Sequence, residues 1–149
     1  IGLIDCAGLR LQEATDALNA FGSLYASKVM ASGVIPQITA VFGNCGGGVA
    51  VANALGDFTF MEDEAKVFVS SPNVLEGNYV EKLDTAASEF QAECGNVDFV
   101  EKKEDIYNQI RQLVTILPSN NEDDDSYEEC TDDLNRVRRR SKRSKNRIG

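Results

Sequence analysis

Hydrophobic side chains change their spacing several times along the chain, and each change predicts a new element. Residues 1–5, IGLID, form a short apolar run that is typical of a buried strand. In residues 13–33 the apolar side chains recur every three or four positions, so they fall on one face of a helix, and Gly33 predicts its end. The expected face consists of Ala14, Leu18, Phe21, Tyr25 and Val29.

The middle of the chain continues this alternation. Residues 34–43, VIPQITAVFG, are rich in β-branched side chains and predict a second buried strand. The small residues of GGGVAVANALGD, 46–57, indicate a short helix. Two apolar runs, around Phe58 and around Phe68, then flank the polar segment 61–65, and they predict a β-hairpin.

Three further elements follow. Residues 72–95 indicate irregular helical structure, and residues 97–100 a short strand. Residues 104–118 predict a helix with one apolar face, which Pro118 ends. Strands and helices that alternate at βαβ spacing predict an α/β fold.

The composition changes after Pro118. Residues 119–135 form an acidic linker, and residues 136–149 hold eight of the chain's 15 Lys and Arg residues and no acidic residue. Neither segment has enough apolar residues to order by itself, so we expect the folded part to be residues 1–118. That part is acidic, which argues against nucleic-acid binding because phosphate contacts need clustered Lys and Arg.

Composition excludes several kinds of chemistry. The chain has no histidine, so a Ser-His-Asp or Cys-His site cannot form within it. Its four cysteines are scattered singly, which indicates neither a zinc site nor a disulfide framework. It has no run of about 20 apolar residues that would span a membrane. We therefore expect no bound metal, no membrane insertion and a reducing, cytoplasmic location.

Three consecutive glycines, Gly46, Gly47 and Gly48, separate the second strand from the short helix. They fit neither a P-loop nor the GxGxxG spacing of dinucleotide sites. Backbone N–H groups at a helix start have no partner within the helix and can bind an oxyanion, such as the enolate of a thioester. The alternative is that the glycines only allow the helix and the strand to pack closely.

Five motifs occur in an order that resembles the carboxyltransferase subunits of biotin-dependent acyl-CoA carboxylases and the related decarboxylases. The resemblance covers roughly residues 1–135. DCAGLR at 5–10, QEA at 12–14 and GGG at 46–48 stand where the family has DSGGAR, QEG and AGG. ASGVIPQ at 31–37 and LPSNN at 117–121 match the family as they are. Cys6, Ala7 and Leu9 depart from the family pattern, so they leave the substrate uncertain.

The resemblance implies a crotonase-like fold, a spiral of ββα units, with two lobes in each complete carboxyltransferase. Residues 1–118 would be the C-terminal part of the N-terminal lobe, which binds the acyl-CoA thioester. Carboxybiotin would lie on the C-terminal lobe of a partner protomer in a homo-oligomer. The chain has no MKM biotinyl-lysine motif, so biotin would come on a separate carrier domain or subunit.

The resemblance also implies roles for seven residues. The N–H groups of Gly47 and Gly48 would form the oxyanion hole for the thioester, and Gly8 and Leu9 would form a second donor loop. The expected substrate-binding residues are Gly46, Ala7 and Arg10, although Arg10 could instead belong to a structural network with Gln12 and Glu13. Cys45 is not expected to act as a nucleophile, because nothing nearby in the sequence activates its thiol.

Other interpretations stay open. The basic tail could result from a shifted reading frame, from an incomplete fragment, or from a genuine extension that binds an anionic partner. In the last case the chain would be a non-catalytic crotonase-like interaction protein. A crotonase-type acyl-CoA hydratase or isomerase is a further alternative, but no spacing identifies the glutamate base that it would need.

Overall fold

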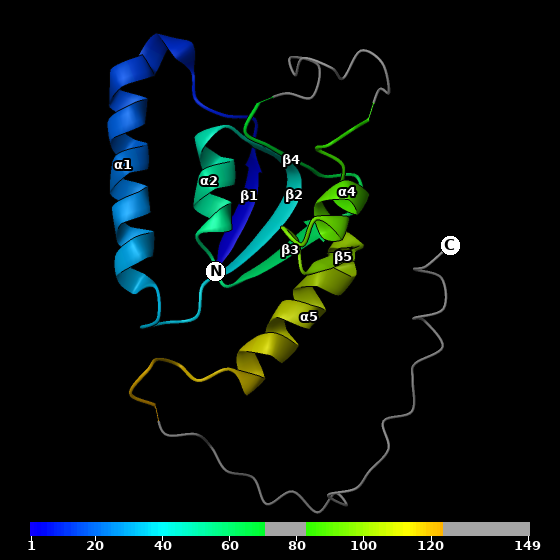
Figure 1. Cartoon of the computed structure of the whole chain (residues 1–149). Helices are drawn as coiled ribbons and strands as arrows, with labels where there is room; N and C mark the ends of the chain where they lie inside the picture. The colour runs from blue at the N-terminus through cyan, green and yellow to red at the C-terminus, as the bar shows by residue number, and fades with distance from the viewer. Residues whose placement is uncertain (71–82, 124–149) are drawn as a thin grey trace, which may run out of the picture.

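Strand β2 (Ile38–Gly46) is the central strand of a five-stranded sheet (Figure 1). The computed structural model describes residues 1–70 and 83–123. β2 pairs in parallel with β1 (Gly2–Cys6) on one side, and with β3 (Phe58–Glu62) and β4 (Lys66–Phe68) on the other. β5 (Phe99–Glu101) extends the sheet beyond β3. The predicted α/β class is confirmed.

The predicted β-hairpin at residues 57–71 is wrong. β3 pairs with the first half of β2 and β4 with its second half, and both run parallel to it. The chain therefore steps forward along β2 and does not reverse at the polar turn. One nine-residue strand is long enough to accept two short partners in succession.

Strand β1 was expected to be buried, and this expectation is also wrong. β1 has one neighbouring strand, and its side chains are largely exposed: Leu3 keeps 58% of its surface accessible. β2 behaves as predicted, because residues 38–41 are fully enclosed. The difference arises because elements cover both faces of β2, whereas β1 lies at the edge of the sheet.

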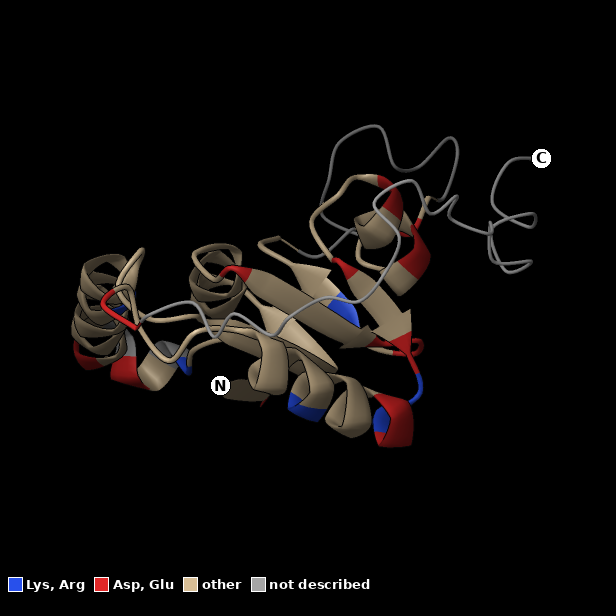
Figure 2. Ribbon diagram, turned by 90° about the horizontal axis from the view of Figure 1, so that it is seen from below, with Lys and Arg blue, Asp and Glu red and all other residues tan. Residues whose placement is uncertain are grey.

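Two long helices lie on opposite faces of the sheet, as Figures 1 and 2 show. α5 (Lys103–Ile116) covers one face, where Ile106 and Ile110 pack on Phe60. The short helix α2 (Gly48–Ala54) covers the other face, and α1 (Ala14–Ala31) packs on α2. α5 buries Ile106 and Ile110, in agreement with its predicted single apolar face, and most of its charged residues lie in its first turn (Figure 2).

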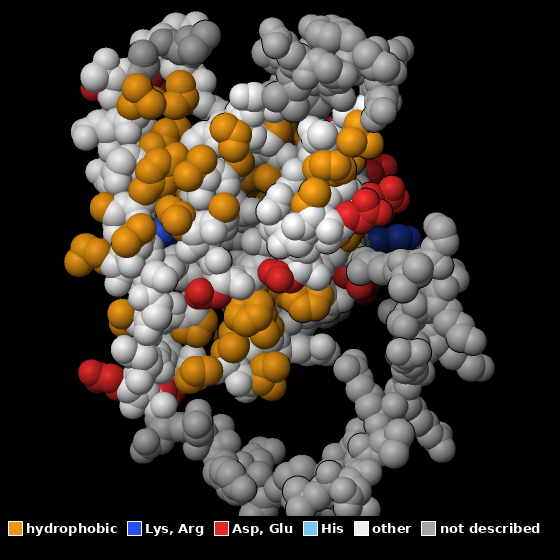
Figure 3. All heavy atoms as spheres, in the orientation of Figure 1, with side chains coloured by type: hydrophobic (Ala, Val, Ile, Leu, Met, Phe, Trp, Pro, Cys, Tyr) orange, Lys and Arg blue, Asp and Glu red, His pale blue; other side chains and the backbone are white. Residues whose placement is uncertain are grey.

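Helix α1 forms where the sequence predicted it and ends before Gly33, which adopts a φ of +73°. Its expected apolar face is only partly correct. Phe21 and Tyr25 are half-buried against α2, whereas Leu18 and Val29 are exposed. Apolar side chains gather over α1 and α2 on the face that Figure 3 shows.

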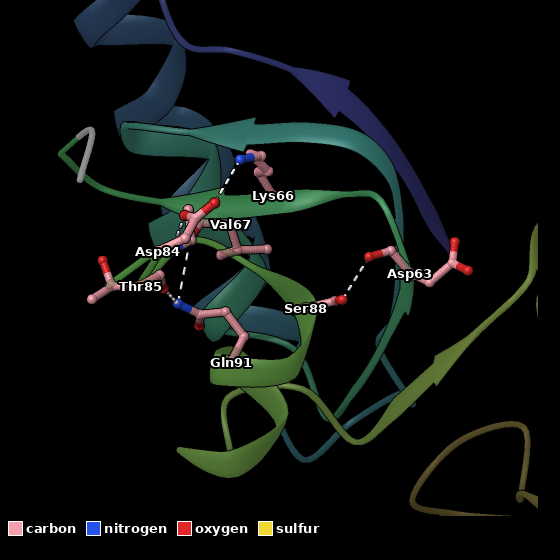
Figure 4. A network of polar contacts seen from close by, with 8 residues as sticks. Asp63, Lys66, Val67, Asp84, Thr85, Ser88 and Gln91 are labelled. Carbon is pink, nitrogen blue, oxygen red and sulfur yellow. Dashed lines mark hydrogen bonds and ion pairs between the residues drawn. The ribbon is translucent and has the colours of Figure 1, made fainter. Parts of the chain in front are cut away.

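A small network of polar contacts holds the turn between β3 and β4 (Figure 4). The Ser88 hydroxyl, at the start of α4 (Ser88–Glu93), donates to the Asp63 carbonyl at 2.7 Å. The Gln91 amide donates to the Thr85 carbonyl at 2.7 Å, and Lys66 pairs with Asp84 at the same distance. These contacts tie α4 to the sheet.

Parts of the predictions lie outside the described residues. They are the helical structure expected across residues 71–82, most of the acidic linker and the whole basic tail. Within the described ranges, no helix is long and apolar enough to cross a membrane.

Candidate functional site

Two loops that the sequence singled out lie side by side in the structure. The first, residues 7–9, follows β1, and the second, residues 46–48, joins β2 to α2. β1 and β2 are parallel neighbours, and Cys6 pairs in register with Cys45. The carboxyl ends of both strands therefore meet at one edge of the sheet. We call residues 7–9 and 46–48 the glycine loops.

The glycine loops touch through their backbones. A Cβ atom at Gly46 would collide with the Ala7 carbonyl oxygen, so only glycine fits this position. Gly8 and Gly47 have φ values of +130° and +60°, which side chains rarely adopt. A Cβ at Gly8 would lie 3.7 Å from the Gly46 carbonyl oxygen. Close packing, one of the two explanations for the glycines, is therefore observed.

The hydrogen bonds at the start of α2 distinguish the three glycines. The Gly47 N–H donates to the Phe68 carbonyl at 2.9 Å, so it is already engaged. The N–H groups of Gly48 and Val49 have no hydrogen-bond acceptor among the described residues. A helix leaves its first N–H groups without an intrahelical partner, and these two occupy that position in α2.

Tyr25 supports the start of α2 from α1. Its hydroxyl donates to the Gly48 carbonyl at 2.8 Å. A Cβ at Gly48 would lie 2.8 Å from that hydroxyl and 3.2 Å from the Phe21 ring, so this glycine allows the aromatic residues to approach. The sequence placed Tyr25 on an apolar face and gave no signal for its hydrogen bond.

Asp5 is a second residue whose role sequence reasoning missed. Its carboxylate lies where a side chain at Gly43 would be, and it accepts the Asn44 N–H at 3.0 Å. The strand register shifts between Ile4 and Cys6, which gives the carboxylate room over β2. Asp5 thereby holds the end of β2 that leads into the second glycine loop. An acidic residue inside an apolar strand was the available signal.

Arg10 and Leu9 differ in their surroundings. The Arg10 side chain is exposed and forms an ion pair with Glu13 at 3.7 Å. The Glu13 side chain is exposed as well. Leu9 is half-buried. The described contacts therefore connect Arg10 to the helical turn that follows and not to the glycine loops.

Cys45 is fully buried beneath the second loop. Burial, and to a lesser degree the neighbouring Cys6, raises the pKa of the Cys45 thiol to about 11. At neutral pH the thiol stays protonated and is a poor nucleophile. The described residues contain no group of three or more His, Cys, Asp or Glu side chains that could hold a metal ion.

A hollow of about 400 Å³ lies beside the C-terminal half of α2. Ala50 and Asn53 of α2, Phe68 of β4 and Gln91 of α4 contribute to its walls. Phe68 is the residue whose carbonyl accepts the Gly47 N–H, so the hollow begins next to the glycine loops. Its lining residues include none of residues 7–9 and none of residues 46–49.

Comparisons with known proteins agree on one family. The family model of the carboxyl transferase domain matches residues 1–146. The α subunit of methylmalonyl-CoA decarboxylase from Propionigenium modestum is 36% identical over 91% of this chain and 27% of its own length. The carboxyltransferase subunit of propionyl-CoA carboxylase from Haloferax mediterranei is 37% identical over 92% of this chain and 28% of its own length.

Solved structures give the same result. Transcarboxylase 12S, determined with methylmalonyl-CoA and methylmalonic acid bound, matches with a TM-score of 0.75 and 32% identity over 88% of this chain and 27% of its own. The β subunit of geranyl-CoA carboxylase from P. aeruginosa matches with a TM-score of 0.66 and 25% identity over 78% of this chain and 23% of its own. The chain thus spans 27% to 28% of the two curated relatives described above.

Proposed function

The chain belongs to the carboxyl transferase domain family, and its fold is part of one crotonase-like lobe. From this premise we propose that it is the acyl-CoA-binding part of an enzyme that moves a carboxyl group between carboxybiotin and an acyl-CoA. One observation carries the proposal: the two glycine loops touch through their backbones, next to N–H groups of α2 that have no acceptor in the described ranges. Such donors suit a thioester oxygen.

The proposed chemistry uses backbone donors. When the α-carbon of the acyl group loses its proton, negative charge develops on the thioester oxygen. The Gly48 N–H, with its neighbour at Val49, is placed to stabilise this charge, and one such donor is worth about 2.7–4 kcal/mol of transition-state stabilisation. Gly47 contributes mainly by having no side chain, because its N–H already bonds Phe68.

Biotin would supply the carboxyl group in this reaction when its carrier docks. We propose that the first glycine loop borders the biotin ring through its backbone, since Gly8 has no Cβ and adopts a φ of +130°. Gly8 and Leu9 are therefore the residues that would face the ring. Their N–H groups would position its ureido oxygen.

The substrate is an acyl-CoA, and Gly46 and Ala7 are proposed to border it. Relatives named for propionyl-CoA and methylmalonyl-CoA support a short acyl group. Arg10 is retained as a candidate for the phosphates of coenzyme A, because its side chain is exposed. We also propose a homo-oligomer, in which the C-terminal lobe of a partner protomer completes the site. This assembly and the biotin carrier are both proposed because the chain belongs to the carboxyl transferase domain family.

Binding can be tested with the chain itself by NMR, since glycine amide signals occupy their own region of a ¹⁵N–¹H spectrum. Propionyl-CoA and methylmalonyl-CoA are expected to shift the signals of Gly46, Gly47 and Gly48. Free coenzyme A is expected to shift them less, because it has no thioester oxygen. Gly22 and Gly33 serve as internal controls, because a Cβ at either would have no neighbour within 4 Å.

Two outcomes would contradict the proposal. One is an unchanged set of glycine-loop signals at saturating propionyl-CoA. The other is equal shifts with free coenzyme A and with both acyl-CoA esters, which would remove the role of the thioester oxygen.

A further inference from the structure

Cys6 and Cys45 lie opposite each other on neighbouring strands. They are register partners of β1 and β2. Neighbouring strands are about 4.8 Å apart, and disulfides form between Cα atoms about 4.4–6.8 Å apart. The backbone therefore places these two residues within the range of a disulfide.

Both side chains belong to the same face of the sheet. Register partners on neighbouring strands point to the same face of the sheet, and Cys6 and Cys45 are such partners on the far side of the register shift that follows Ile4. Ile4 packs against the buried cluster that contains Cys45 and Val41. The two thiols also interact electrostatically, because Cys6 contributes to the raised pKa of Cys45.

The two thiols differ in access. Cys6 is exposed, whereas Cys45 has no accessible surface. A small oxidant can therefore reach Cys6 but not Cys45. The pair has the arrangement of an attacking and a resolving cysteine.

We propose that Cys6 and Cys45 form a modification site for small disulfides such as oxidised glutathione. The Cys6 thiolate attacks one sulfur of oxidised glutathione and expels one glutathione thiolate, which leaves a mixed disulfide on Cys6. Cys45 then gives up its proton and displaces the second glutathione thiolate, which takes up that proton. The products are one Cys6–Cys45 disulfide and two reduced glutathione molecules, so the two electrons lost by the protein thiols reduce the oxidant.

The bond would tie the glycine loops together at their first residues. Cys6 directly precedes Ala7, and Cys45 directly precedes Gly46. Bond formation does not depend on the proposed function. Its consequence does: if the glycine loops bind an acyl-CoA, the disulfide removes their freedom to adjust to it.

The second step is expected to be slow at neutral pH and to accelerate with pH. Few charged groups surround Cys45. On β1 they are Cys6 and Asp5, whose carboxylate bonds Asn44, and on β4 the nearest is Lys66, which pairs with Asp84; α2 carries none. With the pKa of Cys45 near 11, the thiolate fraction rises about tenfold per pH unit below that value.

The test treats the full chain with oxidised glutathione under native conditions and measures the intact mass. We expect transient addition of a glutathionyl group to Cys6, followed by its loss. Because Cys94 is exposed as well, the mass is read in a Cys94→Ser, Cys130→Ser background, where the final value should be lower by two hydrogen atoms than that of the reduced chain. Tryptic mapping without reductant should join peptide 1–10 to peptide 29–66. In denaturant the preference for the Cys6–Cys45 disulfide should vanish. Neighbouring cysteines in the sequence are separated by similar numbers of residues, so the unfolded chain favours no single pair.

Two variants assign the steps. Cys45→Ala should accumulate the mixed disulfide on Cys6, and Cys6→Ser should leave Cys45 reduced. The proposal is overturned if the native wild-type chain keeps glutathione on Cys6 at pH 9, or if peptide 1–10 joins the peptide that contains Cys94. Because the readout is a mass, failure of acyl-CoA binding would leave this result unaffected.

Discussion

The two faces of the sheet are packed with different kinds of side chain. On the α5 face, the buried cluster includes Phe60 and three isoleucines. On the α2 face, the buried cluster contains no aromatic residue and consists of alanines, valines, Cys45 and Met61; Cys45 directly precedes the second glycine loop. Large side chains would fill the space that a ligand needs in order to reach backbone N–H groups. In this chain the large apolar core and the proposed backbone site therefore lie on opposite faces of the sheet.

Ile106→Ala is expected to have the largest effect, because it removes most of a fully buried side chain from the α5 face. Comparable truncations cost about 2–5 kcal/mol of unfolding free energy. Urea unfolding followed by circular dichroism measures the loss. Ile116→Ala, at a side chain that is 78% exposed, is the matched control and should change stability little. Equal losses in both variants would show that the α5 face is not the stabilising one.

Gly46→Ala tests the α2 face and should follow in size. Its Cβ would collide with the Ala7 carbonyl, which is backbone and cannot rotate away. We expect a loss of about 1–3 kcal/mol, typical of overpacking, together with shifted NMR signals for residues 7–9. Gly22→Ala adds the same methyl group within α1, where a Cβ has no neighbour within 4 Å, and should be neutral or stabilising. If Gly46→Ala leaves the unfolding free energy unchanged, the contact between Gly46 and the Ala7 carbonyl does not constrain the site.

Tyr25→Phe removes the hydrogen bond to the Gly48 carbonyl and leaves the ring in place. The expected loss is about 0.5–1.5 kcal/mol, with faster amide exchange at the start of α2. Hydrogen exchange and thermal unfolding measure the two effects. Tyr107→Phe is the control, because the described residues offer its hydroxyl no hydrogen bond and its ring stacks on Phe42. Identical exchange in both variants would deny Tyr25 a supporting role.

The Lys66–Asp84 pair belongs to neither cluster, its side chains are exposed, and it should have the smallest effect. The hydrogen bond from Lys66 lowers the pKa of Asp84 below its usual 3.8. Its contribution is therefore present above pH 3.8 and is lost as pH falls through the lower folded-state pKa. Both side chains are nearly half exposed, so we expect less than about 1 kcal/mol. A double-mutant cycle with Asp84→Asn and Lys66→Gln measures the coupling, and a salt-independent value would contradict it.

Local patterns in the sequence predicted the elements that depend on local structure. The start and end of α1, the buried β2 and the α5 helix before Pro118 all appear where expected. Each has a clear periodicity or a strong end signal, and Gly33 adopts the positive φ that such an end requires. The position of the glycines between β2 and α2 was likewise readable.

Contacts between distant segments could not be read in this way. The local sequence does not distinguish a β-hairpin from two short strands that pair one after the other with β2. The predicted hairpin of β3 and β4 was therefore wrong. The exposure of β1 depends on which elements cover it. Asp5 and Tyr25 act across 39 and 23 residues of sequence, and only the fold brings them to their partners.

The contact between Gly46 and the Ala7 carbonyl also constrains how this chain can evolve. Every other amino acid carries a Cβ, so within this backbone any substitution at position 46 must be accompanied by a movement of the Ala7 carbonyl. The change that this chain can accept at position 46 therefore depends on how the loop at residues 7–9 can shift.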